Sequence, residues 1–270
     1  MKLIDTHAHL QFKAYDEDRD EVVKRNSEEL EAVINVGTSV DASEKGIQLA
    51  EKIDNFYASV AVHPHHVDQW GGNTYNQLKS LSQNPKVVAV GEIGLDNHLY
   101  KPLRVLRSNE LQGYPKPDLK KQAKILEEQI NLARELGKPI LFHCRDAYDE
   151  LYEQIKDYKG KVRGLMHCYM GTWEQAKKFL ELGLYISFSG NITYRGNDYI
   201  RGVAKKLPPE KILTETDSPF LSPEPRRGQR NEPIYVKMVA ATIATLRNLR
   251  TEKAVQITTE NAKNLFDLTI

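Results

Sequence analysis

Two histidines separated by one residue follow an apolar run near the start of the chain. His7 and His9 come directly after Leu3-Ile4, in the segment Asp-Thr-His-Ala-His-Leu. Because side chains alternate between the two faces of a β-strand, both imidazoles would point to the same side. Two converging neutral imidazoles can each give a nitrogen lone pair to a divalent metal ion. The alternative is an ordinary pair of polar residues at a strand end, and ligands elsewhere in the chain would decide between the two.

Further imidazoles and carboxylates follow other apolar runs of the sequence. Seven of the eight histidines lie at such positions, and only His98 lies elsewhere. In chain order, the groups that follow these runs are His7 and His9, His63-Pro64-His65-His66, Glu92, His143-Cys144-Arg145-Asp146, His167-Cys168-Tyr169, and Glu215-Thr216-Asp217. Scattered surface histidines would not collect in this way, so the pattern favours a metal site.

The donor types indicate which ions would bind. Imidazole with carboxylate suits Zn²⁺ or Mn²⁺, and additional carboxylate and water would suit Mg²⁺. Four histidines and two carboxylates exceed what one tetrahedral zinc ion needs, so we expect two divalent metal ions that share a carboxylate. Glu92 is placed to be that bridge. Asp5 and Glu215 would lie a layer deeper and support the ligands.

The same alternation predicts which residues next to the candidate ligands face the site and which face away from it. Arg145 follows His143 by two residues and shares its face, where a guanidinium could hold a phosphate or a carboxylate. A salt bridge at the start of a helix is the alternative. Cys144 and Cys168 each follow a candidate ligand by one residue, so we expect them to face the surrounding helices as small buried groups and not to bind metal.

The elements that must position these side chains alternate regularly along the chain. Eight apolar runs, mostly continuous in Val, Ile and Leu, predict parallel strands covered on both faces. They span 2–6, 32–36, 57–62, 87–93, 139–142, 162–166, 184–188 and 212–216. Helices are expected between them, at about 16–30, 41–53, 74–82, 118–137, 146–157, 172–183 and 197–206, with two more at about 232–248 and 252–266. Eight such units predict an α/β fold, a (β/α)8 TIM barrel in one domain over 1–270, whose active site would lie at the carboxyl ends of the strands.

One segment breaks this alternation. Residues 97–117 separate a strand from the next helix by about twenty residues and carry four basic side chains. Loops of this length inside a compact domain are usually functional. We expect an insertion loop near the active-site face.

Composition limits the classes of function. The 270 residues have a net charge of +1, so contact with nucleic acid would need a local basic patch. Two cysteines make no disulfide framework, and neither a signal peptide nor an apolar run long enough to span a membrane is found. We therefore expect a cytoplasmic protein with no membrane association and no obligate protein partner.

The motifs together resemble the TatD family of metal-dependent deoxyribonucleases, which are amidohydrolase-like barrels. The resemblance covers nearly the whole chain, in family order, and includes Gly-Glu-Ile-Gly-Leu-Asp, His-Cys-Arg-Asp-Ala, Glu-Thr-Asp-Ser-Pro and Arg-Gly-Gln-Arg-Asn-Glu-Pro. It implies the metal ligands His7, His9, Glu92, His143, His167 and Asp217, and DNA as substrate. Two departures are Asn97-His98, which opens the insertion, and Tyr169-Met170, where the family often has Phe-Ser.

The resemblance implies hydrolysis of phosphodiester bonds of DNA, as an exonuclease on single strands or 3' ends, by a water that the metal ions activate. Glu92 and Asp217 would be the catalytic carboxylates, with Asp217 as the base that orients the water. His65 and Arg145 would contact phosphate. Arg227 and Arg230 could follow a DNA backbone on the same rim, or belong to a solvated loop.

Two other functions are open at this point. The same barrel and metals could hydrolyse a carbon–nitrogen or carboxyl-ester bond, as an amidohydrolase or an aminoacyl-tRNA deacylase. A glutamate at the bridging position, where related amidohydrolases often have a modified lysine, favours the TatD type. A non-catalytic metal-bound scaffold for nucleic acid is the other alternative, but none of the six ligands is lost.

Overall fold

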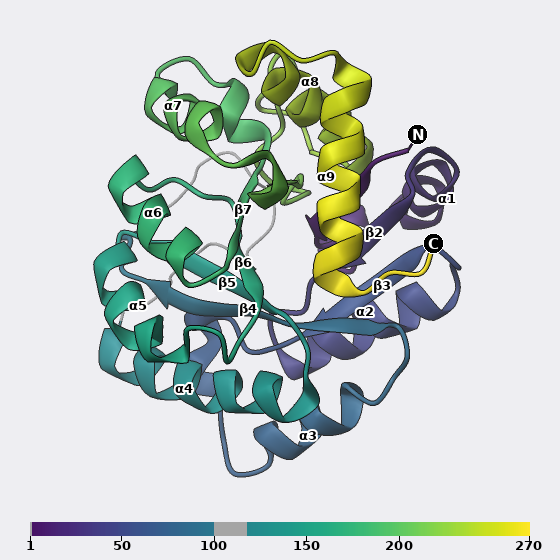
Figure 1. Ribbon diagram of the computed structural model, residues 1–270. Helices are drawn as coiled ribbons and strands as arrows, with labels where there is room; N and C mark the ends of the chain where they lie inside the picture. Colours follow the sequence, from purple (N-terminus) through teal and green to yellow (C-terminus); the bar gives the residue numbers. More distant parts are fainter. Residues whose placement is uncertain (1, 100–117) are drawn as a thin grey trace.

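The computed structural model of the chain describes residues 2–99 and 118–270, and it is a parallel barrel surrounded by helices (Figure 1). The eight strands follow one another around the sheet in sequence order, and each neighbouring pair is parallel. The strands are β1 (Ile4–Ala8), β2 (Ala32–Asn35), β3 (Phe56–Val60), β4 (Val87–Asp96), β5 (Ile140–Arg145), β6 (Gly164–Met166), β7 (Tyr185–Phe188) and β8 (Ile212–Thr214). The predicted single-domain (β/α)8 fold is thus confirmed.

The sheet closes on itself through the residues that follow β8. The backbone N–H of Asp217 donates to the carbonyl of His7 at 2.9 Å, and that of His9 donates to the carbonyl of Ser218 at 2.8 Å. Ala8 and Ser218 form an isolated parallel bridge. The closure therefore places Asp217 directly beside the two histidines of the first strand.

Nine helices of the described residues cover the outside of the barrel (Figure 1). They are α1 (Arg19–Glu29), α2 (Val40–Glu51), α3 (Thr74–Leu81), α4 (Leu119–Leu136), α5 (Tyr148–Ile155), α6 (Trp173–Glu181), α7 (Asp198–Lys206), α8 (Val236–Leu246) and α9 (Thr251–Phe266). The predicted end signals are present. Asp118 caps α4 by accepting from the N–H of Lys121, and Thr172 and Gln175 form the capping box of α6.

A buried apolar cluster fills the barrel near the beginning of its strands. It joins strand residues such as Ile4, Leu141 and Leu213 to Leu265 and Phe266 in the last turn of α9. The apolar interior at this end leaves the carboxyl ends of the strands for polar side chains, as barrels of this type require.

Two sequence predictions concern the insertion and the absence of a membrane-spanning segment. The insertion predicted over 97–117 lies outside the described residues from position 100 onward. In the described parts of the chain, no helix combines the length and the apolar character that crossing a membrane requires.

Candidate metal centre

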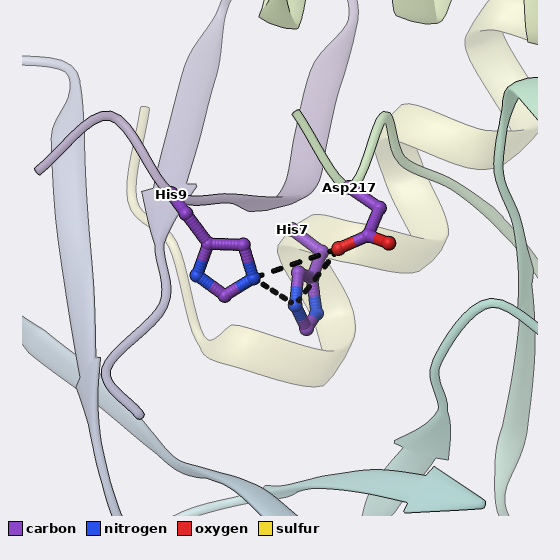
Figure 2. Close-up of side chains that lie close together, drawn as sticks. All are labelled: His7, His9 and Asp217. Carbon is purple, nitrogen blue, oxygen red and sulfur yellow. Dashed lines mark hydrogen bonds and ion pairs between the residues drawn. The ribbon is translucent and has the colours of Figure 1, made fainter. Parts of the chain in front are cut away.

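Three donor groups from the two ends of the chain meet at the carboxyl end of β1 (Figure 2). The Nε2 atoms of His7 and His9 lie 3.2 Å apart, and Oδ1 of Asp217 lies 3.8 Å and 3.5 Å from them, respectively. The predicted alternation of His7 and His9 thus brings both rings to one point. His9 donates from Nδ1 to the carbonyl of Val36 at 2.9 Å, which leaves the lone pair of its Nε2 directed at the cluster.

This cluster fits a divalent ion. A tetrahedral Zn²⁺ with bonds of about 2.05 Å to nitrogen places two donor atoms roughly 3.3 Å apart, close to the separation of the His7 and His9 nitrogens. His7, His9 and Asp217 each offer one donor atom, and these atoms lie within 4.8 Å of one another. The imidazole and carboxylate donors are those that Zn²⁺ and Mn²⁺ prefer.

Glu92 lies at the centre of the site, between two groups of histidines. Its Oε2 atom is 3.4 Å from Nε2 of His7, and its Oε1 atom is 2.6 Å from Nδ1 of His143 and 3.2 Å from Nε2 of His167. The pairing of β4 with β5 shifts register between Gly91 and Ile93, so Glu92 falls at an irregularity that turns its side chain inward. The structure brings all six predicted ligands together.

His143 and His167 each contact a second carboxylate through the ring nitrogen that faces away from Glu92. Nε2 of His143 lies 3.0 Å from Oδ2 of Asp96, and Nδ1 of His167 lies 2.6 Å from Oε1 of Glu215. Such carboxylates fix the ring orientation of a ligating histidine and raise its basicity. The supporting position predicted for Glu215 is therefore observed.

Burial and charge shift the pKa values of these groups in opposite directions. Burial lowers the pKa of His7, and the nearby His167 lowers it further. Burial also opposes protonation of His143, but Glu92 and Asp96 outweigh it and raise its pKa to about 9. For His167, Glu215 and Glu92 outweigh burial in the same way and raise the pKa to about 10. The carboxylates thus hold positive charge at this site, as they would for a bound cation.

Two residues to which the sequence patterns assigned no role, Asp96 and His63, lie at the site. Asp96 accepts from both His65, at 2.8 Å, and His143, and its pKa is lowered because these hydrogen bonds and charges outweigh burial. The available signal was its position four residues after Glu92 on the same strand. His63 lies with its Nε2 3.7 Å from Oε1 of Glu92.

The hydrogen bonding of His63 indicates a supporting position. Its Nδ1 accepts from the backbone N–H of His65 at 3.0 Å, and burial lowers its pKa to about 3. The neutral ring therefore carries its proton on Nε2, which faces Glu92. In this form the Nε2–H group of His63 points at Glu92 but lies beyond hydrogen-bond distance from it.

The expectation for Cys168 was wrong. Both cysteines are among the lining residues of the site cavity, but Cys144 is buried in the apolar core as predicted, whereas Cys168 is only partly buried, with its Sγ 3.1 Å from Oγ of Ser189. The strand β6 ends at Met166, and Cys168 has a positive φ of 43°. Strand alternation therefore no longer governs where its side chain points.

The ligand cluster opens into a cavity of about 970 Å³. Two of the predicted substrate contacts, His65 and Arg145, line this cavity. Arg227 and Arg230 are not among its described lining residues. The guanidinium of Arg227 lies 4.2 Å above the ring of Tyr194, which does line the cavity. Arg230 forms a two-point ion pair with Asp18 instead, at 2.7 and 2.6 Å.

Comparison with known proteins places this site in a family. The family model for TatD related DNase matches residues 4–267. The chain is 38% identical over 266 residues to the uncharacterised metal-dependent hydrolase YabD of Bacillus subtilis, with 98% of both chains covered. It is 30% identical to the 3'-5' ssDNA/RNA exonuclease TatD of Erwinia tasmaniensis, and the alignment covers 98% of this chain and 100% of that relative.

A solved structure agrees with this assignment. The crystal structure of YJJV, a TatD homologue from Escherichia coli K12, superposes with a TM-score of 0.86 at 29% identity, with 98% of both chains covered. The chain therefore belongs to the TatD family and is a metal-dependent hydrolase of that family.

Proposed function

We propose that the protein is an exonuclease that hydrolyses phosphodiester bonds of single-stranded DNA with two divalent ions, Zn²⁺, Mn²⁺ or Mg²⁺. The observation that carries the proposal is the position of Glu92. One of its oxygens faces His7 and the other faces His143 and His167, at the base of an open cavity. The name of the Erwinia relative supports nucleic acid as substrate and the 3' end as the site of attack.

The protein side chains would hold the ions and would take up the proton of the attacking water. Bound ions would supply an activated water and would stabilise charge on the phosphate oxygens. Glu92 would bridge the two ion positions, and His7, His9, His143, His167 and Asp217 would complete them. Asp217 would orient the water and accept its proton. Burial opposes the charged form of Asp217, but the hydrogen bond with His9 and the nearby histidines outweigh burial and lower its pKa, so the carboxylate is ionised before it takes up a proton.

The phosphate is bound on the side of the cavity formed by the ends of β3, β4 and β5. His65 and Arg145 line this side, and α5 begins three residues after Arg145. A guanidinium fork and the positive end of a helix both favour an anionic oxygen. These groups would hold the substrate phosphate against the ions.

The test compares substrates and variants with the metal-loaded protein. We expect release of nucleotides from 3'-tailed single-stranded DNA, loss of this activity after chelation, and its return when Zn²⁺, Mn²⁺ or Mg²⁺ is added. Blunt duplex DNA, single-stranded RNA, a cyclic amide and an aminoacyl ester are the comparison substrates. Cleavage of the amide or the ester alone would replace the proposal by the amidohydrolase or deacylase alternative.

Two variants test the assigned residues. Asp217→Asn and His143→Ala should each lower metal-dependent cleavage by at least about 100-fold, because they remove the base and a ligand. Circular dichroism checks that both variants keep the folded barrel. Undiminished cleavage by either folded variant would contradict the mechanism.

A further inference from the structure

The cavity above the ligand cluster has two chemically different sides. The side formed by the ends of β3, β4 and β5 is ionisable and includes His65, His98 and Arg145. The opposite side is formed by the segments that follow β1 and β8 and includes Phe12, Phe220 and Leu221, with Gln11 and Lys13 beside Phe12. The metal centre lies between them, since it takes ligands from β1, β4 and the segment after β8. A substrate that spans the cavity therefore meets ionisable groups on one side and an apolar surface with a polar margin on the other.

Two phenylalanines form the core of the apolar side, and they stand next to a metal ligand. The ring of Phe12 stacks on the ring of His9, with 4.6 Å between centroids and an interplanar angle of 11°. Phe220 meets both rings edge-on, at 6.2 Å from Phe12 and 6.4 Å from His9. We call Phe12, Phe220 and Leu221 the aromatic wall.

The aromatic wall is not part of the closed core. Its three side chains are each partly exposed and line the cavity, whereas fully buried rings such as Phe142 and Phe188 pack in the core between the strands and the helices. Partly exposed aromatic rings beside a ligand-binding site are suited to stacking with a planar group. The three side chains of the wall carry no hydrogen-bonding group, so they would hold the faces of such a group, while Gln11 and Lys13 lie beside Phe12 at the margin of the wall.

We propose that the aromatic wall binds the nucleobase of a nucleotide that flanks the scissile phosphodiester bond. This inference rests on the proposed function and adds the way in which substrate is recognised. Base–aromatic stacking is tolerant of sequence because every base has a π-face. The enzyme should therefore require a base at this position but show little preference among the four bases.

The wall has a second conceivable effect that the experiment must separate from base binding. Phe12 covers one face of His9 and so also helps to orient that ligand. A purely supporting ring would change metal binding and would affect all substrates equally. A base-binding ring would change KM only for substrates that carry the base.

The experiment measures KM and kcat on single-stranded oligonucleotides that are intact or lack one base. The missing base is placed at the 3'-terminal nucleotide in one substrate and at the next nucleotide in another. For the unaltered protein, we expect loss of the base at one of these two positions to raise KM about 5- to 150-fold, which corresponds to about 1 to 3 kcal/mol. The four possible bases at that position should give KM values within about threefold of one another.

Variants assign the effect to the wall. Phe12→Leu and Phe220→Leu keep apolar volume but remove the ring, and should raise KM about fivefold or more for the intact substrate while leaving KM for the substrate without the base unchanged. Tyr75→Leu is the matched control, because Tyr75 is a partly exposed aromatic residue on α3 that is not among the described lining residues of the cavity. Metal affinity of each variant is measured by calorimetry in parallel.

The outcomes separate this inference from the proposed function. Equal KM values for intact and base-free substrates would overturn the inference alone, since cleavage would still be present. Equal losses on all substrates, together with weaker metal binding, would also overturn it and would leave Phe12 as a support for His9. Failure of the unaltered protein to cleave any phosphodiester would instead refute the proposed function.

Discussion

The histidines of the metal centre do not all present the same ring nitrogen. His9 and His167 use Nδ1 for Val36 and Glu215, so their Nε2 atoms face the centre. His143 has the reverse arrangement, because Asp96 holds its Nε2 and its Nδ1 points at Glu92. The partner of the outer nitrogen therefore decides which lone pair a metal ion receives.

Asp96 should be necessary for tight metal binding although it is not a predicted ligand. Asp96→Asn removes the charge that holds His143 in its orientation, so we expect metal affinity to fall about 10- to 100-fold, measured by calorimetry. Asp146→Asn is the control, since Asp146 also pairs with a histidine, His98, at 2.7 Å, but has an exposed side chain. Equal affinities of the two variants would show that Asp96 does not position the ligand.

At this scale, the sequence predicted ligand types better than side-chain directions. His7 and His9 converge because β1 continues through Ala8, which keeps the alternation valid. Cys168 and Asp217 lie beyond the ends of their strands, with φ values of 43° and 57°, so no strand period applies to them. The position of Asp96 behind His143 depends on ring orientation, which residue spacing does not contain.

At the scale of elements, the approach of β4 to β5 positions two parts of the site. Gly94 pairs with His143, and a Cβ atom at Gly94 would lie 1.8 Å from the carbonyl oxygen of His143. Only glycine allows this approach of the two strands. A backbone contact, and not a loop, thus sets the distance between Glu92 and His143.

A side chain at Gly94 should therefore affect stability and metal binding together. Gly94→Ala forces β5 away from β4, so we expect the free energy of unfolding to fall by about 1 to 3 kcal/mol, with weaker metal binding because His143 moves. Gly202→Ala is the control, since its Cβ would meet nothing within 4 Å in α7, and it should be neutral or stabilising by up to about 1 kcal/mol. Denaturant unfolding measures both, and equal midpoints would contradict the role of Gly94.

Arg230 and Arg145 should have different roles. We expect Arg230 to hold the segment before α8 in place and Arg145 to bind substrate. Arg230 ties the segment before α8 to Asp18 before α1 and lies 4.6 Å above the ring of Tyr15, whereas Arg145 lines the cavity. We expect Arg230→Gln to lower the free energy of unfolding by about 1 kcal/mol and to leave KM unchanged. Arg145→Gln should raise KM about tenfold with little change in stability. If Arg230→Gln raised KM and left the free energy of unfolding unchanged, Arg230 would be a substrate contact after all.

The sequence predicted the existence and order of the elements more accurately than their ends. The capping residues Asp118 and Thr172 mark α4 and α6 because capping is a local interaction. The first and eighth helices were expected to begin at about 16 and 232. They begin at Arg19 and Val236. Residues 16–18 form a turn before α1, and the 3-10 helix Pro233–Tyr235 takes the first residues predicted for α8.

For the whole molecule, closure of the barrel and assembly of the site are the same event. The bonds between His7 and Asp217 and between His9 and Ser218 join β1 to the segment after β8, and they carry three donor groups into contact. Distances across this closure could not be predicted from the sequence, because they depend on the curvature of all eight strands. The fold class could be, because eight strand-and-helix units in order allow few other arrangements.

Metal ions should consequently stabilise the entire barrel. The ligands come from both ends of the chain and from its middle, so an unfolded chain has no comparable site, and binding adds RT ln(1 + [L]/Kd) to the free energy of unfolding. At a hundredfold excess over Kd this is about 2.7 kcal/mol, which should raise Tm by roughly 5 to 10 °C. Thermal unfolding of chelator-treated protein with added Zn²⁺, Mn²⁺ or Mg²⁺ measures the shift and ranks the ions. The His7→Ala/His9→Ala double variant should lose most of this rise in Tm. An equal rise in that variant would mean that the ion binds elsewhere and that the closure between β1 and the segment after β8 does not depend on it.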